Sequence, residues 1–195
     1  LPVLPLLVVG MIAIRTGLAI TATISIASPE GVTGVRLWVV TLRLVGAALV
    51  GLPRPVVPGL RWARHDQWHV TLRFLGESDP EEAAVALADL AAQPAVAELG
   101  PVTRLLGQRI VVVPVDGLDE LARTVVATTV GLGGPPEDRP FTGHLTLARA
   151  KGPVPPGTVG TPITGRFPVG EVCLVRSRTL PEGAAYETLE RFSLG

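Results

Sequence analysis

The chain has 195 residues, a length typical of one domain or of one compact unit built from two similar lobes. Seventeen basic residues balance seventeen acidic ones, which excludes a long-range positive field of the kind that holds a nucleic-acid duplex by counterion release. Aromatic residues make up only 4% of the chain, which argues against a surface of successive base stacking, so we expect any nucleic-acid ligand to be bound at one end in a small pocket.

Residues 1–33 form a segment of unusual composition. Leu1 to Ile14 is almost wholly apolar, and a second apolar run follows Arg15. A membrane-spanning helix needs about 20 mostly apolar residues, so each run is too short by itself, and one helix over both would place Arg15 near the membrane centre. We expect an extraneous extension, with a membrane anchor and a signal peptide as the alternatives, and a single domain over residues 34–195.

The first half of this domain predicts a strand, a turn-rich connection, a second strand and a helix. The first strand is expected from Val35 to Val40, and the cluster of prolines that follows Leu52 forbids regular structure. The second strand is expected from Trp68 to Leu75. Asp79-Pro80-Glu81-Glu82 predicts the start of a helix that runs to about Ala92, with the aspartate as its cap.

The second half again combines strands with a helix. A β-branched strand, a helix with apolar residues on one face and another strand are expected, followed by a loop rich in proline and glycine and by two closing strands. Their ranges are Ile110 to Val113, Asp119 to Val130, His144 to Ala150, Gly152 to Pro168, Glu171 to Ser177 and Tyr186 to Phe192. Each half contains one strand with a histidine at or near its start, which predicts an α+β fold with two small sheets facing across a cleft and helices outside.

Two short segments, His69-Val-Thr71-Leu and His144-Leu-Thr146-Leu, carry the chemistry. In a strand, residues i and i+2 point to the same face, so each histidine shares a face with its threonine while the apolar residues point the other way. If the two strands meet at the cleft, two imidazoles and two hydroxyls converge on one small volume.

Two converging imidazoles favour acid-base catalysis on a phosphate ester. With an unperturbed pKa near 6.5, one ring can act as base at neutral pH while the other, charged by its surroundings, acts as acid. Opening a cyclic phosphate needs this combination, because water must lose a proton and the leaving ribose oxygen must gain one. Thr71 and Thr146 can donate hydrogen bonds to the non-bridging oxygens, and no metal or other cofactor is required.

Other interpretations of these residues are weaker. One His-x-Thr in an apolar strand is often a structural histidine, but two copies are hard to dismiss. A zinc site from His65, His69 and His144 lacks a carboxylate or cysteine at ligand spacing, and a serine hydrolase would need a G-x-S-x-G elbow that the sequence does not contain. His65 is expected to be a solvated side chain.

These segments and their flanks resemble the RNA 2′,3′-cyclic phosphodiesterases, also called 2′-5′ RNA ligases, of the two-histidine phosphoesterases. The matching stretches are Arg36-Leu-Trp-Val, Gly59-Leu-Arg-Trp, Trp68-His-Val-Thr-Leu-Arg-Phe-Leu-Gly-Glu77, Arg139-Pro-Phe-Thr-Gly-His-Leu-Thr-Leu-Ala-Arg-Ala-Lys151, Leu174-Val-Arg-Ser and Tyr186-Glu-Thr-Leu-Glu-Arg-Phe. Together they span about residues 35 to 194. The doubled His-x-Thr-Leu is the most specific part of the resemblance.

The resemblance implies a bilobal fold with mostly antiparallel sheets, hydrolysis of a 2′,3′-cyclic RNA end to a 2′-phosphate, and in some members reversible ATP-independent 2′-5′ joining. It assigns catalysis to His69 and His144, phosphate binding to Thr71 and Thr146, and a phosphate contact to Arg149, for which a surface charge is the alternative. The sequence departs from the family in residues 1–33, in the apolar stretch from Thr41 to Leu52, and at Gly143, where proline is common.

The expected partners are RNA ends or small cyclic nucleotides, bound by a monomer with no protein partner; a membrane is involved only if residues 1–33 are an anchor. The lone cysteine, Cys173, lies in an apolar run and cannot form an internal disulfide, which favours a reducing, cytoplasmic location. A non-catalytic nucleotide- or RNA-end-binding module is the alternative function.

Overall fold

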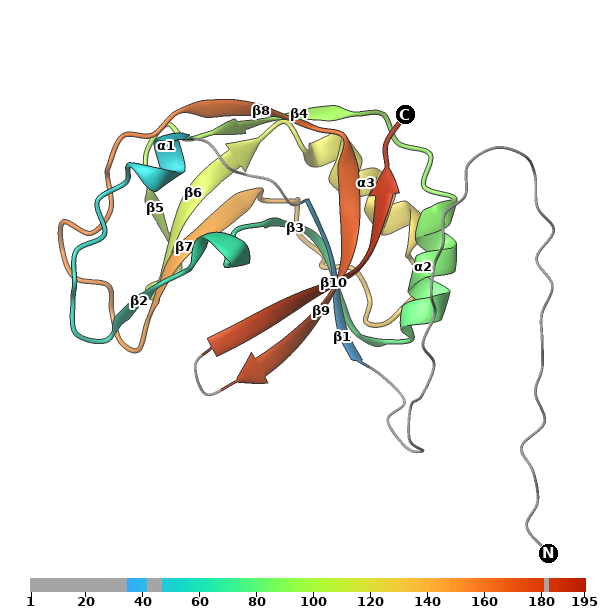
Figure 1. Ribbon diagram of the computed structural model, residues 1–195, viewed down its shortest axis with the longest axis horizontal. Helices are drawn as coiled ribbons and strands as arrows, with labels where there is room; N and C mark the ends of the chain where they lie inside the picture. Colours follow the sequence, from blue (N-terminus) through green and yellow to red (C-terminus); the bar gives the residue numbers. More distant parts are fainter. Residues whose placement is uncertain (1–34, 42–46, 181–182) are drawn as a thin grey trace, which may run out of the picture. The chain divides into compact units, whose positions relative to one another are not determined.

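The computed structural model describes residues 35–41, 47–180 and 183–195 (Figure 1). The expectations for residues 1–33 therefore lie outside the described residues, as does part of the apolar stretch after the first strand. Within the described ranges, no helix is long and apolar enough to cross a membrane.

The strands pair side by side into one curved antiparallel sheet, in the order β10-β9-β1-β3-β7-β6-β4-β8, with β2 on β7 and β5 on β6 (Figure 1). The strands are β1 (Val35–Thr41), β2 (Leu60–Trp62), β3 (Val70–Ser78), β4 (Ala95–Leu99), β5 (Arg104–Leu106), β6 (Ile110–Asp116), β7 (His144–Ala150), β8 (Gly165–Val169), β9 (Glu171–Leu180) and β10 (Gly183–Ser193). The helices are α1 (Ala47–Val50), the 3₁₀ turn η1 (His65–Gln67), α2 (Pro80–Ala88) and α3 (Asp119–Thr128).

The sheet consists of two lobes that meet at one residue pair. Strands β3 and β7 are in register only at Val70 and Leu145, whereas β1 with β3 and β6 with β7 are paired over most of their length. Beyond this junction the two strands are not paired, which opens a space between the lobes. The predicted α+β class and the two lobes are confirmed, and the two expected sheets are the halves of one continuous sheet.

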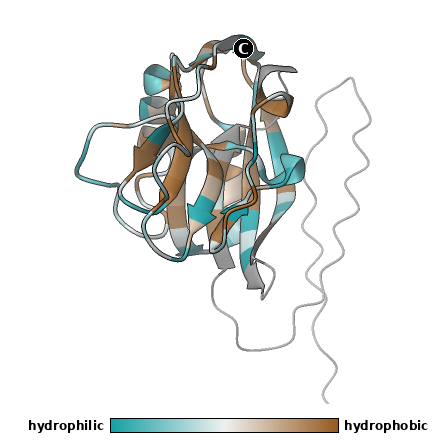
Figure 2. Cartoon of the chain, turned by 90° about the vertical axis from the view of Figure 1, so that its left-hand side faces the viewer, coloured by the Kyte–Doolittle hydropathy of each residue, from teal (hydrophilic) through white to brown (hydrophobic). Residues whose placement is uncertain are grey.

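Helices α2 and α3 pack against the sheet and against each other. Asp79 caps α2 as predicted, with its carboxylate accepting hydrogen bonds from the backbone of Glu81 at 2.7 Å and of Glu82. Leu121 and Val125 form the buried face of α3, in keeping with their spacing in the sequence. Figure 2 shows hydrophobic residues running along the strands, where most of the core lies.

The strand β8 contradicts the prediction of a loop from Gly152 to Pro168. Gly165 and Pro168 predict an interruption of regular secondary structure, yet β8 pairs with β4 over five residues. It lies at the end of the strand order, where proline is tolerated because an edge strand has one side without a ladder of hydrogen bonds. The short strands β2, β4 and β5 were likewise not predicted, since none of them shows a long alternating pattern.

Candidate active site

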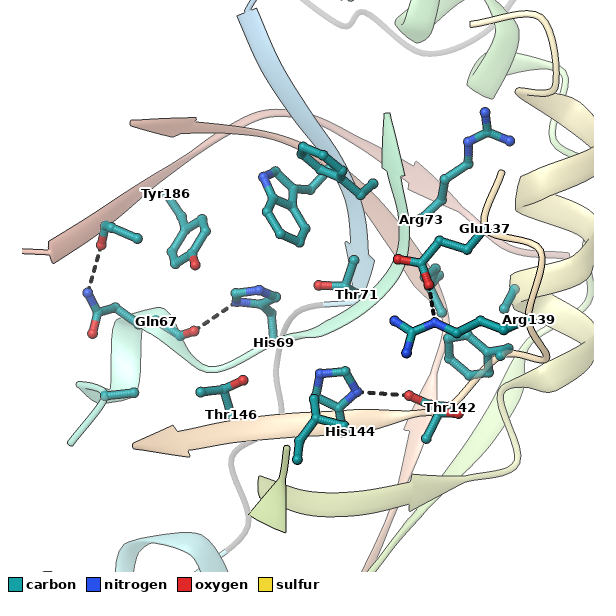
Figure 3. Close-up of a pocket in the computed structure, with 18 of the residues that line it drawn as sticks. Gln67, His69, Thr71, Arg73, Glu137, Arg139, Thr142, His144, Thr146 and Tyr186 are labelled. Atoms are coloured by element: carbon teal, nitrogen blue, oxygen red, sulfur yellow. Dashed lines mark hydrogen bonds and ion pairs between the residues drawn. The ribbon is translucent and has the colours of Figure 1, made fainter. Parts of the chain in front are cut away.

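The junction between the lobes brings the two histidine segments together. His69 directly precedes Val70 and His144 directly precedes Leu145, the pair that joins β3 to β7. In this antiparallel register His69 lies across from Thr146, and Thr71 lies across from His144, so that all four side chains share one face (Figure 3). The convergence expected from the sequence is therefore present in the structure.

Both imidazole rings are oriented by the same kind of hydrogen bond. The Nδ1 atom of His69 lies 2.8 Å from the carbonyl oxygen of Gln67, and Nδ1 of His144 lies 2.8 Å from the carbonyl oxygen of Thr142 (Figure 3). A carbonyl can only accept a hydrogen bond, so Nδ1 carries the hydrogen in each ring. The Nε2 atoms are left to exchange protons with a ligand, which is the arrangement required of a general acid and a general base.

The four side chains line a cavity of about 680 Å³ between the two lobes. This volume suits a small ligand such as a nucleotide, since ligand pockets commonly measure about 300–1,000 Å³. The candidate site is therefore a local pocket, as the balanced charge of the chain predicts.

An aromatic wall lies beside His69. The ring of Tyr186 meets the imidazole edge-on, with centroids 4.6 Å apart, and Trp38 lies behind at 6.5 Å and packs on Phe74 at 4.5 Å. Burial raises the pKa of the Tyr186 hydroxyl, so it remains a hydrogen-bond donor at neutral pH. These rings keep water away from one side of His69.

Burial lowers the pKa of His69 from its ordinary value of 6.5. The hydrogen bond to Gln67 opposes this shift, and the charges of Arg149 and His144 add to it. The neutral form of His69 is therefore favoured in the open cavity, because a charged imidazole would be partly desolvated and would face other cations.

Gln67 also connects the His69 turn to the distant hairpin of β9 and β10. Its side-chain amide donates to the carbonyl of Ala184 at 2.8 Å and accepts from the backbone N–H of Arg64 at 2.9 Å. One residue thus fixes the His69 ring through its carbonyl and the strand that carries Tyr186 through its side chain.

Arg149 lines the same cavity as the histidines and threonines. Its positive charge lowers the pKa of His69 and opposes the rise in the pKa of Tyr186. All five residues predicted for the site are therefore brought together.

His65 lies apart from the cavity lining. Its ring stacks on Trp68 with centroids 4.4 Å apart, and its Nε2 atom lies 3.2 Å from the guanidinium of Arg54. Across the described ranges, no group of three His, Cys, Asp or Glu side chains is placed to hold a metal ion. The zinc site considered above is therefore not assembled by these three histidines.

Gly143 precedes the second histidine at a point where the backbone of β6 approaches closely. A Cβ atom at this position would lie 2.1 Å from the carbonyl oxygen of Val115, and the N–H of Val115 donates to the carbonyl of Gly143 at 2.9 Å. Glycine, which stands here where proline is common in the family, therefore allows the close contact that positions the start of β7.

We expect Gly143→Ala to lower the free energy of unfolding by about 1–3 kcal/mol, because the methyl group forces a backbone shift in a packed region. Urea unfolding measures this change. Gly152→Ala is the matched control, since nothing lies within 4 Å of a Cβ atom there. Equal stability of the two variants would contradict the proposed close contact.

Comparisons with known proteins identify the family. The model of the LigT-like phosphoesterases matches residues 52–100. The chain is 36% identical over 172 residues to an RNA 2′,3′-cyclic phosphodiesterase of Thermus thermophilus, covering 77% of this chain and 84% of that relative. The chain belongs to the RNA 2′,3′-cyclic phosphodiesterase family of LigT-like phosphoesterases. This confirms the resemblance carried by the two His-x-Thr-Leu segments.

Further relatives agree with this family. An RNA 2′,3′-cyclic phosphodiesterase of Geobacillus stearothermophilus is 31% identical over an alignment of 154 positions, with 71% of this chain and 49% of that relative covered. A crystal structure from Thermus thermophilus matches with a TM-score of 0.65 and 28% identity, over 81% of this chain and 97% of that one. E. coli LigT shares the fold, with a TM-score of 0.65 and 24% identity over 83% of this chain and 98% of that one.

The LigT-like family resemblance did not single out several residues that build the cavity. Gln67 lies next to the first motif, and its side-chain bond to Ala184 spans 117 positions, so no local pattern reveals it. Tyr186 belongs to a matching stretch at the end of the chain, which was the available signal. Arg61 likewise lies in a matching stretch, Gly59-Leu-Arg-Trp, and it also lines the cavity.

Proposed function

We propose that this chain hydrolyses RNA 2′,3′-cyclic phosphate ends to 2′-phosphates by metal-free acid-base catalysis with His69 and His144. The observation that carries the proposal is the pair of imidazoles with Nδ1 bonded to carbonyls and Nε2 available in one cavity. The family supports the reaction, since relatives with 36% and 31% identity are RNA 2′,3′-cyclic phosphodiesterases.

In the proposed reaction water attacks phosphorus in line with the bond to the ribose 3′ oxygen. One imidazole takes a proton from the water while the other gives a proton to the departing 3′ oxygen, which yields a 2′-phosphate and a 3′-hydroxyl. The threonine hydroxyls donate to the non-bridging oxygens, whose charge must be held during the transfer. After the reaction the two histidines have exchanged protonation states, and solvent restores them.

The same geometry accommodates the related joining reaction. If a ribose 5′-hydroxyl takes the place of water, the same two proton transfers form a 2′-5′ linkage without ATP, and the reaction is reversible. Arg149 adds positive charge to the same cavity, which suits a contact with a phosphate of the ligand. The proposed ligands are therefore RNA ends and small cyclic nucleotides; nucleotide binding is a property of a solved relative, since E. coli LigT has been crystallised with 3′-AMP.

A non-catalytic module that binds nucleotides is the second candidate. The volume and arginines of the cavity suit binding alone. Binding does not, however, require two rings that each carry a fixed Nδ1 hydrogen and an available Nε2 atom. The presence of this arrangement in both rings favours the catalytic function.

The test is incubation with a nucleoside 2′,3′-cyclic phosphate in excess EDTA, followed by identification of the phosphate position by NMR or chromatography. We expect full turnover and a 2′-phosphate product, because imidazoles and hydroxyls perform the proposed steps. Activity that disappears in EDTA and returns with zinc or manganese would contradict the metal-free mechanism. Absence of turnover despite nucleotide binding would support the binding module instead.

The environment of His69 predicts a distinctive pH dependence. Its pKa is lowered in the folded chain, so the neutral form persists below pH 6.5, and activity that needs one neutral imidazole is lost only as the pH falls through the lowered value. The same shift means that folding stability decreases with falling pH, because the unfolded chain binds the proton more readily. NMR titration of the imidazole signals measures the pKa directly.

Arg149→Gln provides the matched perturbation for this titration. Removing the guanidinium charge should move the pKa of His69 upward, while Arg104→Gln, outside the cavity lining, should leave it in place. A His69 signal that titrates at or above pH 6.5 in the unaltered protein would show that burial does not control the pKa of this ring.

A further inference from the structure

Strands β3 and β7 share an irregularity just beyond their histidines. The pairing of β3 with β1 skips Leu72, and the pairing of β7 with β6 skips Leu147. Each is the third residue after a histidine. An extra residue of this kind is a β-bulge, which interrupts the alternation of faces. Phe74 and Arg149, the fifth residues after the histidines, both line the cavity as a result.

Each of these two residues lies directly opposite a similar residue on the neighbouring strand. Phe74 is in register with Trp38 of β1, and Arg149 is in register with Arg61 of β2. All four residues line the cavity. The two lobes therefore present different chemistry at equivalent positions, an aromatic pair on one side of the histidines and an arginine pair on the other.

The arginine pair has the features of an anion site. Directly opposite residues of an antiparallel pair have Cβ atoms about 5 Å apart on the same face, so the two arginines can approach one anion together. The planar fork of each guanidinium group matches phosphate oxygens. The influence of Arg149 on the pKa of His69 shows that its charge reaches back towards the reacting centre.

We propose that Arg61 and Arg149 form a second phosphate site, which holds the 5′ phosphate of the nucleotide whose cyclic phosphate lies between the histidines. The proposal rests on the function proposed above and narrows its substrate class. A nucleotide that continues into an RNA chain carries this 5′ phosphate, whereas an isolated nucleoside 2′,3′-cyclic phosphate does not. The preferred substrate is therefore the 3′ end of an RNA chain or a 5′-phosphorylated cyclic nucleotide.

The binding test uses ligands that cannot react further. Calorimetric titration compares adenosine 2′-monophosphate with adenosine 2′,5′-bisphosphate. The bisphosphate should bind about tenfold more tightly, the effect of one charge-assisted contact to phosphate. Arg61→Gln should abolish this advantage, and Arg104→Gln, an exposed arginine away from the cavity, should preserve it. Equal binding of the two ligands, or an advantage that survives Arg61→Gln, would overturn the second site.

A parallel turnover test separates this proposal from the proposed function. The ratio of kcat/KM between 5′-phosphorylated and unphosphorylated adenosine 2′,3′-cyclic phosphate should be about ten and should fall towards one in Arg61→Gln. If neither compound is hydrolysed but the bisphosphate keeps an advantage that depends on Arg61, the hydrolysis proposal fails and the second site stands. If both are hydrolysed equally and the bisphosphate binds no better, only the second site fails.

Discussion

Replacing either His69 or His144 with alanine should reduce the turnover of a 2′,3′-cyclic nucleotide by about 10²- to 10⁴-fold. Each replacement removes one of the two proposed proton carriers, whose Nδ1 atoms are hydrogen-bonded to carbonyls. Groups that act as a unit are strongly non-additive, so the double variant should be little worse than either single one. Single-turnover kinetics on the purified variants measure the loss, and circular dichroism verifies that they remain folded.

His65→Ala is the matched control for these variants. This third histidine stacks on Trp68 outside the cavity lining, so its removal should leave turnover within about twofold of the unaltered protein, since surface changes away from a site have small effects. Thr71→Val and Thr146→Val should cost less than the histidine variants, because each deletes one hydrogen bond to phosphate and spares the proton transfers. Near-normal turnover in either histidine variant is incompatible with the two-histidine mechanism.

The core of the site was predictable because it follows from local periodicity. His69 and Thr71 share a face by the two-residue period of a strand, as do His144 and Thr146, and β7 has the bounds expected from its sequence. Family resemblance then indicated that the two strands meet. The structure shows how the two strands meet, through a single residue pair between Val70 and Leu145.

Other parts of the site depend on interactions that no local pattern encodes. Simple alternation places Arg149 on the face opposite His144, and only the bulge at Leu147 brings it into the cavity. The contact of Gln67 with Ala184 joins segments that are distant in the sequence. The strand β8 escaped prediction for a related reason, because pairing with β4 overrides the local preference of its glycine and proline.

Arg73 illustrates a residue whose role is visible only in three dimensions. It lies in β3 two residues after Thr71, and its side chain is 4% exposed. The guanidinium donates to the carbonyls of Val126 at 3.2 Å, Leu132 at 3.2 Å and Gly134 at 3.1 Å. It therefore connects β3, the strand that follows His69, to the end of α3 and to the turn that leads towards His144.

Arg73→Met should lower the free energy of unfolding by about 2–4 kcal/mol, because it keeps much of the aliphatic volume but leaves three carbonyls without their donor, each worth about 1–3 kcal/mol if it stays dry. Urea unfolding measures the loss, and Arg104→Met, at an exposed arginine, should stay within about 0.5 kcal/mol of the unaltered protein. Arg73→Lys should recover only part of the loss, since one ammonium group cannot reproduce the planar fork that reaches three carbonyls.

Because Arg73 also borders the cavity, the rival interpretation is that its charge binds substrate. That interpretation predicts a raised KM with unchanged stability, and a variant with this behaviour would show that Arg73 serves the ligand and not the connection between the two histidine segments.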